Sequence, residues 1–531
     1  MQTVSQSWKN AHKQTLLNEG FVEVSLDIAD PDSVADASAE ANGSVYISDT
    51  PEIVSEVDTP VIPYGTLEQN MWLLNGTRKS IPESDYKDGG YIGDVISNEE
   101  GVFDMKIPII TINFTKVHTK VIPGVTIKWG TAYDEFAEHF IVTAYNGDTV
   151  VSEKEIIENK SVTSIVFMDI VNYDRITIRI LRWCLPNHRA RVDEIFVGLN
   201  KVYSKAELFS YSHEQTVDPL STSLPKMEIK FSIDNSDNAY NPHNLDGWAK
   251  YLTERQAVKT RYGLKLADNT VEWIKGGTFY LSEWYAKQNG ISAEFVARDL
   301  LEFMSTPYKD NVTEMTSRSL YDLAEQVLLA AELPLNSDGT VKWVIDDSLK
   351  SIYTVAPLLV DTVANCLQLI ANTGCCVVYP DRDGLLHIEP INNEPTDYEI
   401  NSFNSYSKPE ITISKSVKQV VVKVYHYTIS ETGIGSSTTE VATTIGETGE
   451  TITVDNPLIT DDERAAIVGK WIGDYLKNRM TMKATGRADV RLDALDIVTN
   501  ENDYGTSRVR MTNVKFDFNG AFRGTGEGRT I

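Results

Sequence analysis

One short stretch, Arg182–His188 (RWCLPNH), contains side chains that could act as a thiol nucleophile and its base. Cys184 and His188 are four residues apart near a strand end. Such a pair acts only when the imidazole lies within hydrogen-bond reach of the sulfur, and neighbours in sequence need not meet in this way. The motifs HExxH, GxSxG and the phosphate-binding P-loop are absent from the sequence. We therefore expect no catalytic residues and no enzymatic activity.

Candidate metal ligands are not clustered in the sequence either. The four cysteines are Cys184, Cys366, Cys375 and Cys376. No pair of them has CxxC spacing, which argues against a zinc site and favours buried thiols. The acidic loop Asp234–Asn244 (DNSDNAYNPHN) resembles a calcium-binding loop, but an EF-hand needs Gly and Glu where this chain has Ala239 and Leu245. We expect a structural turn there, no metal site and no cofactor.

The composition indicates a multidomain protein without a nucleic-acid surface. A length of 531 residues corresponds to about three or four domains. The chain has 49 Lys and Arg against 76 Asp and Glu, a net charge of -27, whereas binding along a phosphate backbone depends on clustered basic residues. No apolar run approaches the roughly 20 residues of a membrane span, and the N-terminal segment lacks the apolar core of a signal peptide. We expect synthesis in the cytoplasm without signal-peptide export.

The elements that would position functional side chains are mostly strands. The stretch Trp273–Met304 predicts two strands, Ile274–Ala286 and Ile291–Ala297, with a hairpin signal at Asn289-Gly290. A related plan recurs in Ala494–Gly524. Two similar β units in one chain predict a duplicated barrel.

Residues 61 to 200 predict an all-β module of short strands separated by turn signals, a pattern typical of a jelly-roll sandwich. The candidate strands are Ile107–Lys116, Val125–Trp129, His139–Tyr145, Val162–Phe167, Arg175–Arg182 and Arg191–Gly198. Neither the alternating strand Phe21–Ile28 nor the set of strands after Gly198 forms a complete sheet by itself. We therefore expect them to share one barrel, into which this module is inserted.

Helical patterns add a smaller α/β part. Ser319–Ala331 and Asp361–Thr373 each have one apolar helical face, and Asp361 is the expected N-cap of the second helix. Thr460–Glu463 predicts a capping box before a third helix. The expectation is a mainly β protein with α+β segments. Its expected parts are residues 1–34 with 200–304 (first barrel), 35–199 (inserted jelly roll), 305–410 (α/β domain) and 411–531 (second barrel with one helix).

Several segments, spread over nearly the whole chain, carry a resemblance to a known family. The inserted module opens with Leu67–Thr77 (LEQNMWLLNGT), Gly89–Phe103 and Ile109–Trp129, and closes with Arg191–Leu199 (RVDEIFVGL). The barrels contain Glu228–Pro242 (EIKFSIDNSDNAYNP), Gly276–Trp284 (GGTFYLSEW), Leu492–Val498 (LDALDIV) and Phe516–Arg529 (FDFNGAFRGTGEGR). In this order the chain resembles the tail or baseplate hub proteins of phages and prophages of Gram-positive bacteria, in which a hub barrel is interrupted by a discoidin-like jelly roll.

The resemblance implies a structural role in a virion tail or baseplate. Hub proteins of this family form a homotrimer that closes the end of the tail tube and links it to the spike or fibre apparatus. The implied partners are tail-tube or distal tail proteins, the tape-measure protein, and spike or fibre proteins. Two similar barrels per chain in a trimer give six similar units, which would match a hexameric tube and leave no exposed sheet edge.

The inserted jelly roll raises an alternative function, recognition of host cell-wall polysaccharide by a receptor-binding tail protein. Modules of this type hold sugars in loops at one end, with aromatic rings for stacking and Arg or Asp for the hydroxyl groups. The candidate residues are Trp72, Trp129, Tyr133, Trp183, Arg189 and Arg191. Trp129 ends a strand and Tyr133 follows it, which favours these two, although strand tryptophans are more often core residues. A fold alone does not establish sugar binding, and the module could equally pack against neighbouring baseplate proteins.

Overall fold

The computed structural model describes residues 1–14, 18–55, 64–66, 68, 78–80, 90–244, 247–287, 290–309, 316–331, 333–334, 340–358, 361–430 and 433–531. These residues form two compact units. Unit 1 contains Met1–Ser25, Val202–Leu333 and Lys342–Ile531, and unit 2 contains Leu26–Lys201 and Pro334–Val341. Strands dominate both units, so the predicted mainly β class is confirmed. Among the described residues, no helix is long and apolar enough to span a membrane.

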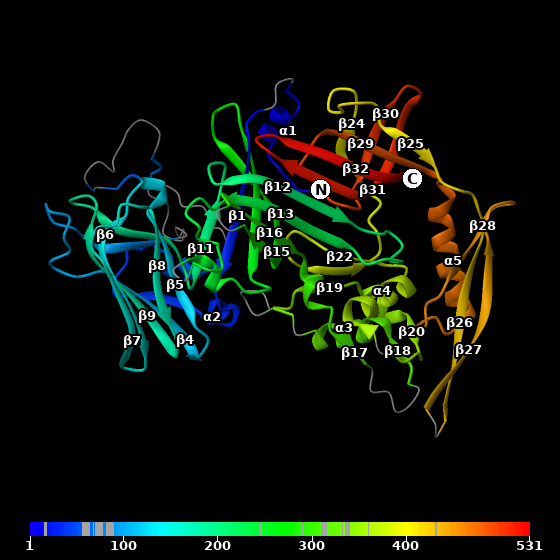
Figure 1. Cartoon of the computed structure of the whole chain (residues 1–531), viewed down its shortest axis with the longest axis horizontal. Coiled ribbons are helices and arrows are strands. Elements are labelled where there is room, and N and C mark those ends of the chain that lie inside the picture. Colours follow the sequence, from blue (N-terminus) through cyan, green and yellow to red (C-terminus); the bar gives the residue numbers. More distant parts are fainter. Residues whose placement is uncertain are drawn as a thin grey trace. The chain divides into compact units, whose positions relative to one another are not determined.

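Unit 2 is a sandwich of two β-sheets around one apolar core (Figure 1). The first sheet contains, in spatial order, β3 (Tyr91–Ile96), β10 (Arg189–Phe196), β5 (Ile122–Trp129) and β8 (Thr163–Ile170). The second contains β2 (Ser38–Ala41), β4 (Ile109–His118), β9 (Tyr173–Trp183), β6 (Ala137–Asn146) and β7 (Thr149–Ile156). The short helices of this unit are α2 (Pro31–Asp36), η1 (Thr50–Val54) and η2 (Thr131–Tyr133). Each of the six strands predicted here overlaps an observed strand, because its alternating apolar residues face the core.

The largest sheet lies mainly in unit 1 and begins with a barrel. Its strands are, in spatial order, β11 (Leu199–Tyr203), β1 (Gly20–Ile28), β14 (Ala257–Lys265), β15 (Val271–Ala286), β16 (Ser292–Arg298), β13 (Lys226–Asp234) and β12 (Leu208–Thr216). Because β11 and β12 are consecutive in the chain, the stretch Leu199–Thr216 lies at both ends of this run and closes it. The predicted hairpin is present as β15 and β16, which pair antiparallel, with Ala286 opposite Ala293. Asn289, in the predicted turn, lies outside the described residues.

The same sheet continues into a second barrel. β12 pairs with β31 (Gly505–Phe518), from Tyr211 opposite Phe518 to Thr216 opposite Asn513. The other strands are β32 (Phe522–Thr530), β29 (Met480–Arg487), β25 (Glu410–Ile413), β30 (Ile497–Asn502) and β24 (Pro395–Ile400). The chain between β24 and β25 pairs with β29 where Ser405 lies opposite Gly486, so the stretch Pro395–Ile413 closes this barrel. β24 belongs to this barrel through its parallel pairing with β30, although it lies before the domain boundary expected at residue 410. No local sequence pattern indicates such a parallel pairing.

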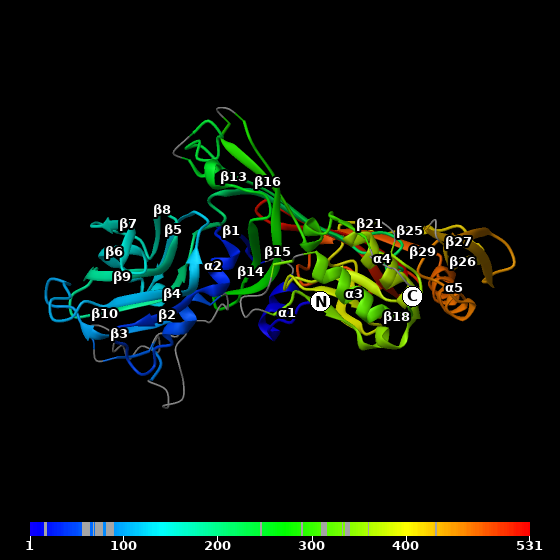
Figure 2. The same cartoon turned by 90° about the horizontal axis from the view of Figure 1, so that it is seen from below.

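Between the barrels, unit 1 contains a small α/β part in which two helices pack side by side (Figure 2). Its helices are α3 (Leu320–Ala330), η5 (Asp347–Ser351) and α4 (Val363–Gly374). Its strands are β17 (Pro307–Tyr308), β18 (Arg318–Ser319), β19 (Trp343–Ile345), β20 (Tyr353–Thr354), β21 (Asp361–Thr362), β22 (Val377–Pro380) and β23 (Leu386–Glu389). Thr362, and not the predicted Asp361, caps α4, because its hydroxyl accepts the N–H of Asn365 at 3.2 Å.

A three-stranded sheet with a helix on one face is inserted between β25 and β29 (Figure 1). We call it the arm sheet; it contains β27 (Gly433–Thr444), β26 (Val417–Ser430) and β28 (Glu450–Val454), with α5 (Asp462–Lys477) packed on it. Asp461, and not the predicted Thr460, caps α5 by accepting the N–H of Arg464 at 2.7 Å. The remaining short helices of unit 1 are α1 (Gln6–His12), η3 (Trp248–Tyr251) and η4 (Leu300–Phe303).

Asp299 lies at the corner where the chain leaves β16 for η4. Its side chain is 4% exposed and accepts the main-chain N–H groups of Met227 at 2.7 Å and Leu301 at 2.8 Å. Burial raises the pKa of Asp299 to about 7, against the partial opposition of these two hydrogen bonds. The unfolded pKa is about 3.9, so the folded chain binds more protons between the two values, and stability falls as pH rises through this window.

We expect this corner to make the protein more stable in mild acid. Between about pH 5 and about pH 8 the contribution of Asp299 to the free energy of unfolding should fall by about 2 to 3 kcal/mol. Asp299→Asn keeps a hydrogen-bond acceptor and removes the titration, so its stability should depend less on pH. Urea unfolding across this range measures the difference, with Asp268→Asn in an exposed turn as the control. The same pH dependence in Asp299→Asn and wild type would contradict the assignment.

Candidate functional site

Two of the predicted sugar-binding aromatic residues lie in the core of the sandwich. Trp129 is 0% exposed, and its ring packs edge-on against Phe140 and Trp183 at centroid distances of 4.9 and 6.1 Å. Trp183 is 1% exposed, and its Nε1–H donates to Glu135 Oε2 at 2.7 Å. Neither indole has a face open to a sugar. Trp72 lies outside the described residues.

Arg191, also predicted to contact sugar, is buried in an ionic cluster. Its Nη2 donates to Glu68 Oε1 at 2.8 Å, and its Nη1 lies 3.7 Å from Glu135 Oε2. Glu135 also pairs with His188 Nδ1 at 3.0 Å. Burial opposes ionisation of Glu68, but the charge and hydrogen bond of Arg191 outweigh it and hold the pKa of Glu68 below its usual value. We call Glu68, Glu135, His188, Arg189 and Arg191 the loop-end cluster.

Tyr133 and Arg189 keep part of their surface open. The Arg189 side chain is 24% exposed, and its main-chain N–H donates to Glu68 Oε2 at 2.8 Å. The Tyr133 ring is half-buried, and the guanidinium carbons of Arg191 and Arg78 lie 4.6 and 4.8 Å from its centroid. A sugar could stack on Tyr133 only where these two groups leave the ring free. The carboxylates that hold the cluster together carry no motif, and sequence reasoning missed them.

Cys184 and His188 do not form a thiol–imidazole pair in the described structure. Cys184 Sγ accepts the main-chain N–H of Phe136 at 3.3 Å, whereas His188 bonds to Glu135. Burial raises the pKa of the Cys184 thiol to about 11. A thiol with this pKa is protonated at neutral pH and is a weak nucleophile.

The acidic loop Asp234–Asn244 is a succession of turns. The side-chain oxygens of Asp234 and Asn235 accept the main-chain N–H groups of Ser236 and Tyr240, each at 2.9 Å. These oxygens therefore stabilise the local backbone. Within the described ranges, no group of three or more His, Cys, Asp and Glu side chains is placed to hold a metal ion.

A second buried ionic site lies in unit 1, where three of its parts meet. Arg382, in the turn between β22 and β23, is 2% exposed. Its Nε donates to Asp493 Oδ1 at 2.6 Å, its Nη1 to the Lys275 carbonyl at 3.0 Å and its Nη2 to the Leu492 carbonyl at 2.8 Å. Lys275 belongs to the first barrel, and the other two acceptors belong to the loop before β30 in the second. One side chain thus ties the α/β part to both barrels. We call Arg382, Asp493 and Asp496 the joint.

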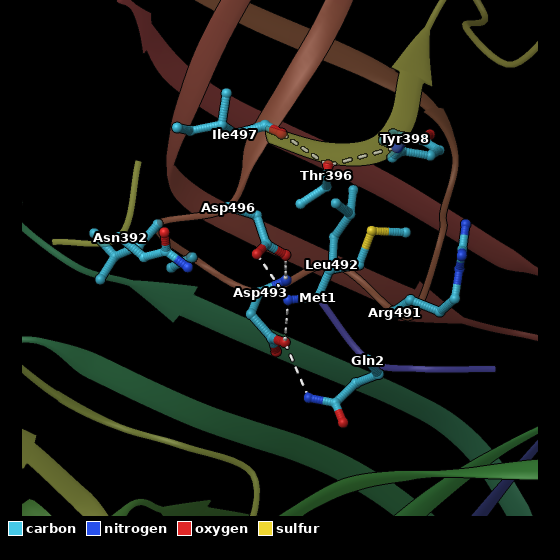
Figure 3. Close-up of polar contacts among 12 residues, drawn as sticks. Met1, Gln2, Asn392, Thr396, Tyr398, Arg491, Leu492, Asp493, Asp496 and Ile497 are labelled. Atoms are coloured by element: carbon cyan, nitrogen blue, oxygen red, sulfur yellow. Dashed lines mark hydrogen bonds and ion pairs between the residues drawn. The ribbon is translucent and has the colours of Figure 1, made fainter. Parts of the chain in front are cut away.

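The amino end of the chain completes the joint (Figure 3). The ammonium of Met1 lies 2.7 Å from Asp496 Oδ1 and 3.5 Å from Asp493 Oδ2. Gln2 Nε2 donates to Asp493 Oδ2 at 3.1 Å. Burial opposes ionisation of Asp493, but Arg382 and the ammonium outweigh it and hold its pKa below the usual value, whereas burial raises the pKa of Asp496. Two carboxylates therefore share two cations.

A chain of buried polar side chains connects the joint to the interior of the first barrel. Gln215 Nε2 lies 3.3 Å from both Asp493 Oδ1 and His213 Nε2. His213 Nδ1 lies 2.6 Å from the Tyr262 hydroxyl, which lies 2.7 Å from that of Tyr211. Burial lowers the pKa of His213 to about 3, so its imidazole is neutral at physiological pH. This series of hydrogen-bonded side chains fixes their positions. Beyond the joint, none of its members carries a charge.

Comparison with known proteins found similarity only among solved structures. No protein-family model matches the chain, and no curated protein matches it. The chain is similar to a 43 kDa tail protein of prophage MuSo2 from Shewanella oneidensis, with 12% identity, a TM-score of 0.40 and coverage of 62% of this chain and 95% of that chain. It is similar to a tail protein from Neisseria meningitidis MC58, with 11% identity, a TM-score of 0.43 and coverage of 62% and 93%. Chitosan-binding module 1 of a chitosanase/glucanase from Paenibacillus sp. IK-5 aligns with 11% identity, a TM-score of 0.20 and coverage of 32% and 97%.

The loop-end cluster predicts a stability effect at Arg191. Arg191→Met removes the buried guanidinium that lies between Glu68 and Glu135, and should lower the free energy of unfolding by about 3 to 5 kcal/mol. Arg189→Met removes the same charge from a partly exposed position and should cost less than about 1 kcal/mol. Thermal unfolding of both variants, followed by circular dichroism, measures the difference. Equal stability of the two variants would show that the buried pair does not hold this end of the sandwich.

The joint predicts energetic coupling between Arg382 and Asp493. Arg382→Met removes three hydrogen bonds and a buried charge, and should cost about 3 to 5 kcal/mol. Arg382→Lys should recover only part of this loss, because an ammonium cannot reach three divergent acceptors. In a double-mutant cycle with Asp493→Asn, we expect a coupling energy of about 2 kcal/mol in urea unfolding. Lys275→Met, at a 55% exposed side chain, is the control. Additive losses from the two joint substitutions would exclude the coupling.

Proposed function

We propose that the chain is a structural hub protein of a phage tail or baseplate, where it closes the tail tube and links it to the spike or fibre apparatus. The observation that supports this most directly is the duplicated barrel. Each barrel is closed by one long stretch of chain, Leu199–Thr216 or Pro395–Ile413, and β12 pairs with β31 to join the two in one sheet. The order of the sequence segments that resemble hub proteins supports the same function.

The proposal includes a homotrimer. Three chains with two barrels each supply six similar units, which suit the end of a tube built from hexameric rings. The partners would be tail-tube or distal tail proteins, the tape-measure protein and spike or fibre proteins, and the location would be the virion tail. The acidic net charge of -27 is consistent with a lumen that does not retain nucleic acid.

The proposal includes no catalytic role. The one thiol and imidazole pair singled out by the sequence is separated, since His188 bonds to Glu135 and the Cys184 thiol is protonated at neutral pH. The described acidic side chains at the joint are engaged with cations inside the unit. These observations support a structural function.

Recognition of cell-wall polysaccharide by unit 2 stays a prediction. Burial of Trp129, Trp183 and Arg191 removes their support for it. Among the described residues, the hypothesis rests on the exposed parts of Tyr133 and Arg189, and Trp72 lies outside the described residues. No described contact favours it over packing against a neighbouring protein.

The mass of the purified full chain in solution tests the proposed assembly. We expect light scattering after size exclusion to give three times the mass of one chain over a concentration series. Negative-stain images of the same fraction should show a ring with a central channel. A single-chain mass at every concentration would contradict the homotrimer.

A further inference from the structure

The two outer strands of the arm sheet each have one unpaired edge in the described structure. β27 and β28 both pair with β26, and neither pairs with another described strand. β27 is 12 residues long and contains one charged residue, Glu440, and no proline. Natural edge strands are usually short or carry Lys, Pro or a bulge, which prevents pairing with another chain. This edge lacks those features.

The outer half of β27 also lacks a covering layer. Figure 1 shows the hairpin extending beyond α5, and residues 434–440 of β27 are all exposed. Strand residues alternate between the two faces, so seven exposed residues in succession mean that both faces are open. Its partner β26 is covered, because Val424 is 0% exposed and the Tyr425 N–H donates to the Ile459 carbonyl at 2.8 Å, so the open surface of the hairpin is that of β27.

We infer that the arm sheet is a contact between copies of this chain, in which β27 of one copy pairs antiparallel with β28 of the next. This inference rests on the proposed homotrimer and names one of its contacts. β26 pairs parallel with β28 and antiparallel with β27. When neighbouring copies are related by rotation about an axis along the strands, β28 therefore meets the next β27 antiparallel, the more stable arrangement. Such a head-to-tail contact uses two different edges, and it closes into a ring of three when the rotation between copies is one third of a turn.

The faces of the strands restrict the register. In β28, Ile452 lies opposite Val420 of β26, and both belong to the apolar cluster under α5. In β27, Val441 lies opposite Val422, so its odd-numbered residues share that face. In a continuous sheet the apolar faces of both copies must lie on the same side, so odd-numbered residues of β27 lie opposite even-numbered residues of β28. On the other face, even-numbered residues of β27 lie opposite odd-numbered residues of β28.

One register with this parity fits the side chains. It places Thr451 of β28 opposite Thr438 and Thr453 opposite Ser436, and Thr–Thr and Thr–Ser pairs are favourable cross-strand neighbours. Glu450 then lies opposite the uncharged Thr439. No like charges are opposed along the five residues of β28.

The backbone of β27 presents the groups that such pairing needs. Next to its C-terminal end, the N–H of Ile445 donates to the carbonyl of Lys418, two residues that continue the β27–β26 register. Antiparallel hydrogen bonds alternate, so odd-numbered residues of β27 bond to β26. The N–H and C=O groups of Ser436 and Thr438 therefore point away from β26. Thr438 lies near the middle of this outward row.

Thr438→Pro tests the contact without breaking the hairpin. It removes an outward N–H, and proline is tolerated on the open side of an edge strand. Thr438→Val is the matched control, because it keeps the N–H and the strand propensity. We expect Thr438→Pro to raise the concentration of half-dissociation of the trimer by about tenfold or more, as loss of one or two backbone hydrogen bonds predicts. Thr438→Val should behave as wild type, and all three proteins should have the same circular dichroism spectrum.

A cross-link tests the register independently. Thr438→Cys and Thr451→Cys in one chain place the two thiols opposite each other across the contact, and mild oxidation should give covalent dimers and trimers on a non-reducing gel. Each single variant, which retains the four native cysteines, should not. A wild-type trimer with neither effect would overturn the arm contact and leave the proposed hub standing. A wild-type single chain would overturn both, and a wild-type dimer would indicate a two-fold contact and overturn the head-to-tail pairing.

Discussion

A strand edge exposes unpaired N–H and C=O groups, and the need to pair them organises unit 1. Each barrel closes by the same device, in which one long stretch of chain pairs with a strand at each end of the run. The second edge of β12, which does not pair within the first barrel, pairs antiparallel with β31. The two barrels are therefore not separate domains on a linker. They share one ladder of hydrogen bonds.

Strand pairing determines which strands lie side by side, but not the angle between the barrels and the α/β part. In unit 1 the buried charge of Arg382 restricts this angle. Arg382 has three acceptors on two barrels, and all of them must be in place for its charge to remain buried. A buried ion pair is weak evidence for added stability, because the cost of removing both charges from water offsets most of their attraction. What it supplies at the joint is selectivity, since a misplaced barrel would leave a buried guanidinium without an acceptor. The joint thus favours one arrangement of the two barrels and the α/β part over arrangements that differ slightly from it.

The sequence predicted what local periodicity controls and missed what distant pairing controls. Alternation located β4, β5 and β9, because their inward residues are apolar. It did not place β24 in the second barrel, because that membership depends on a parallel partner far along the chain. At Trp129 the signal was present, since Val125, Ile127 and Trp129 share one face and all are fully buried. The ionic partners Glu68 and Asp493 gave no signal, because burial of a carboxylate depends on a cation brought to it by the fold.

In the part of the chain that the structure describes, the loop-end cluster and the joint hold charged side chains in the interior. The loop-end cluster and the joint both pair carboxylates with guanidinium groups, and each group is occupied by its own chain. The arm sheet has the opposite character, because its side chains are mostly uncharged and its open groups belong to the backbone. Backbone groups at a strand edge pair with other strands, and the proposed contact between copies depends on this property.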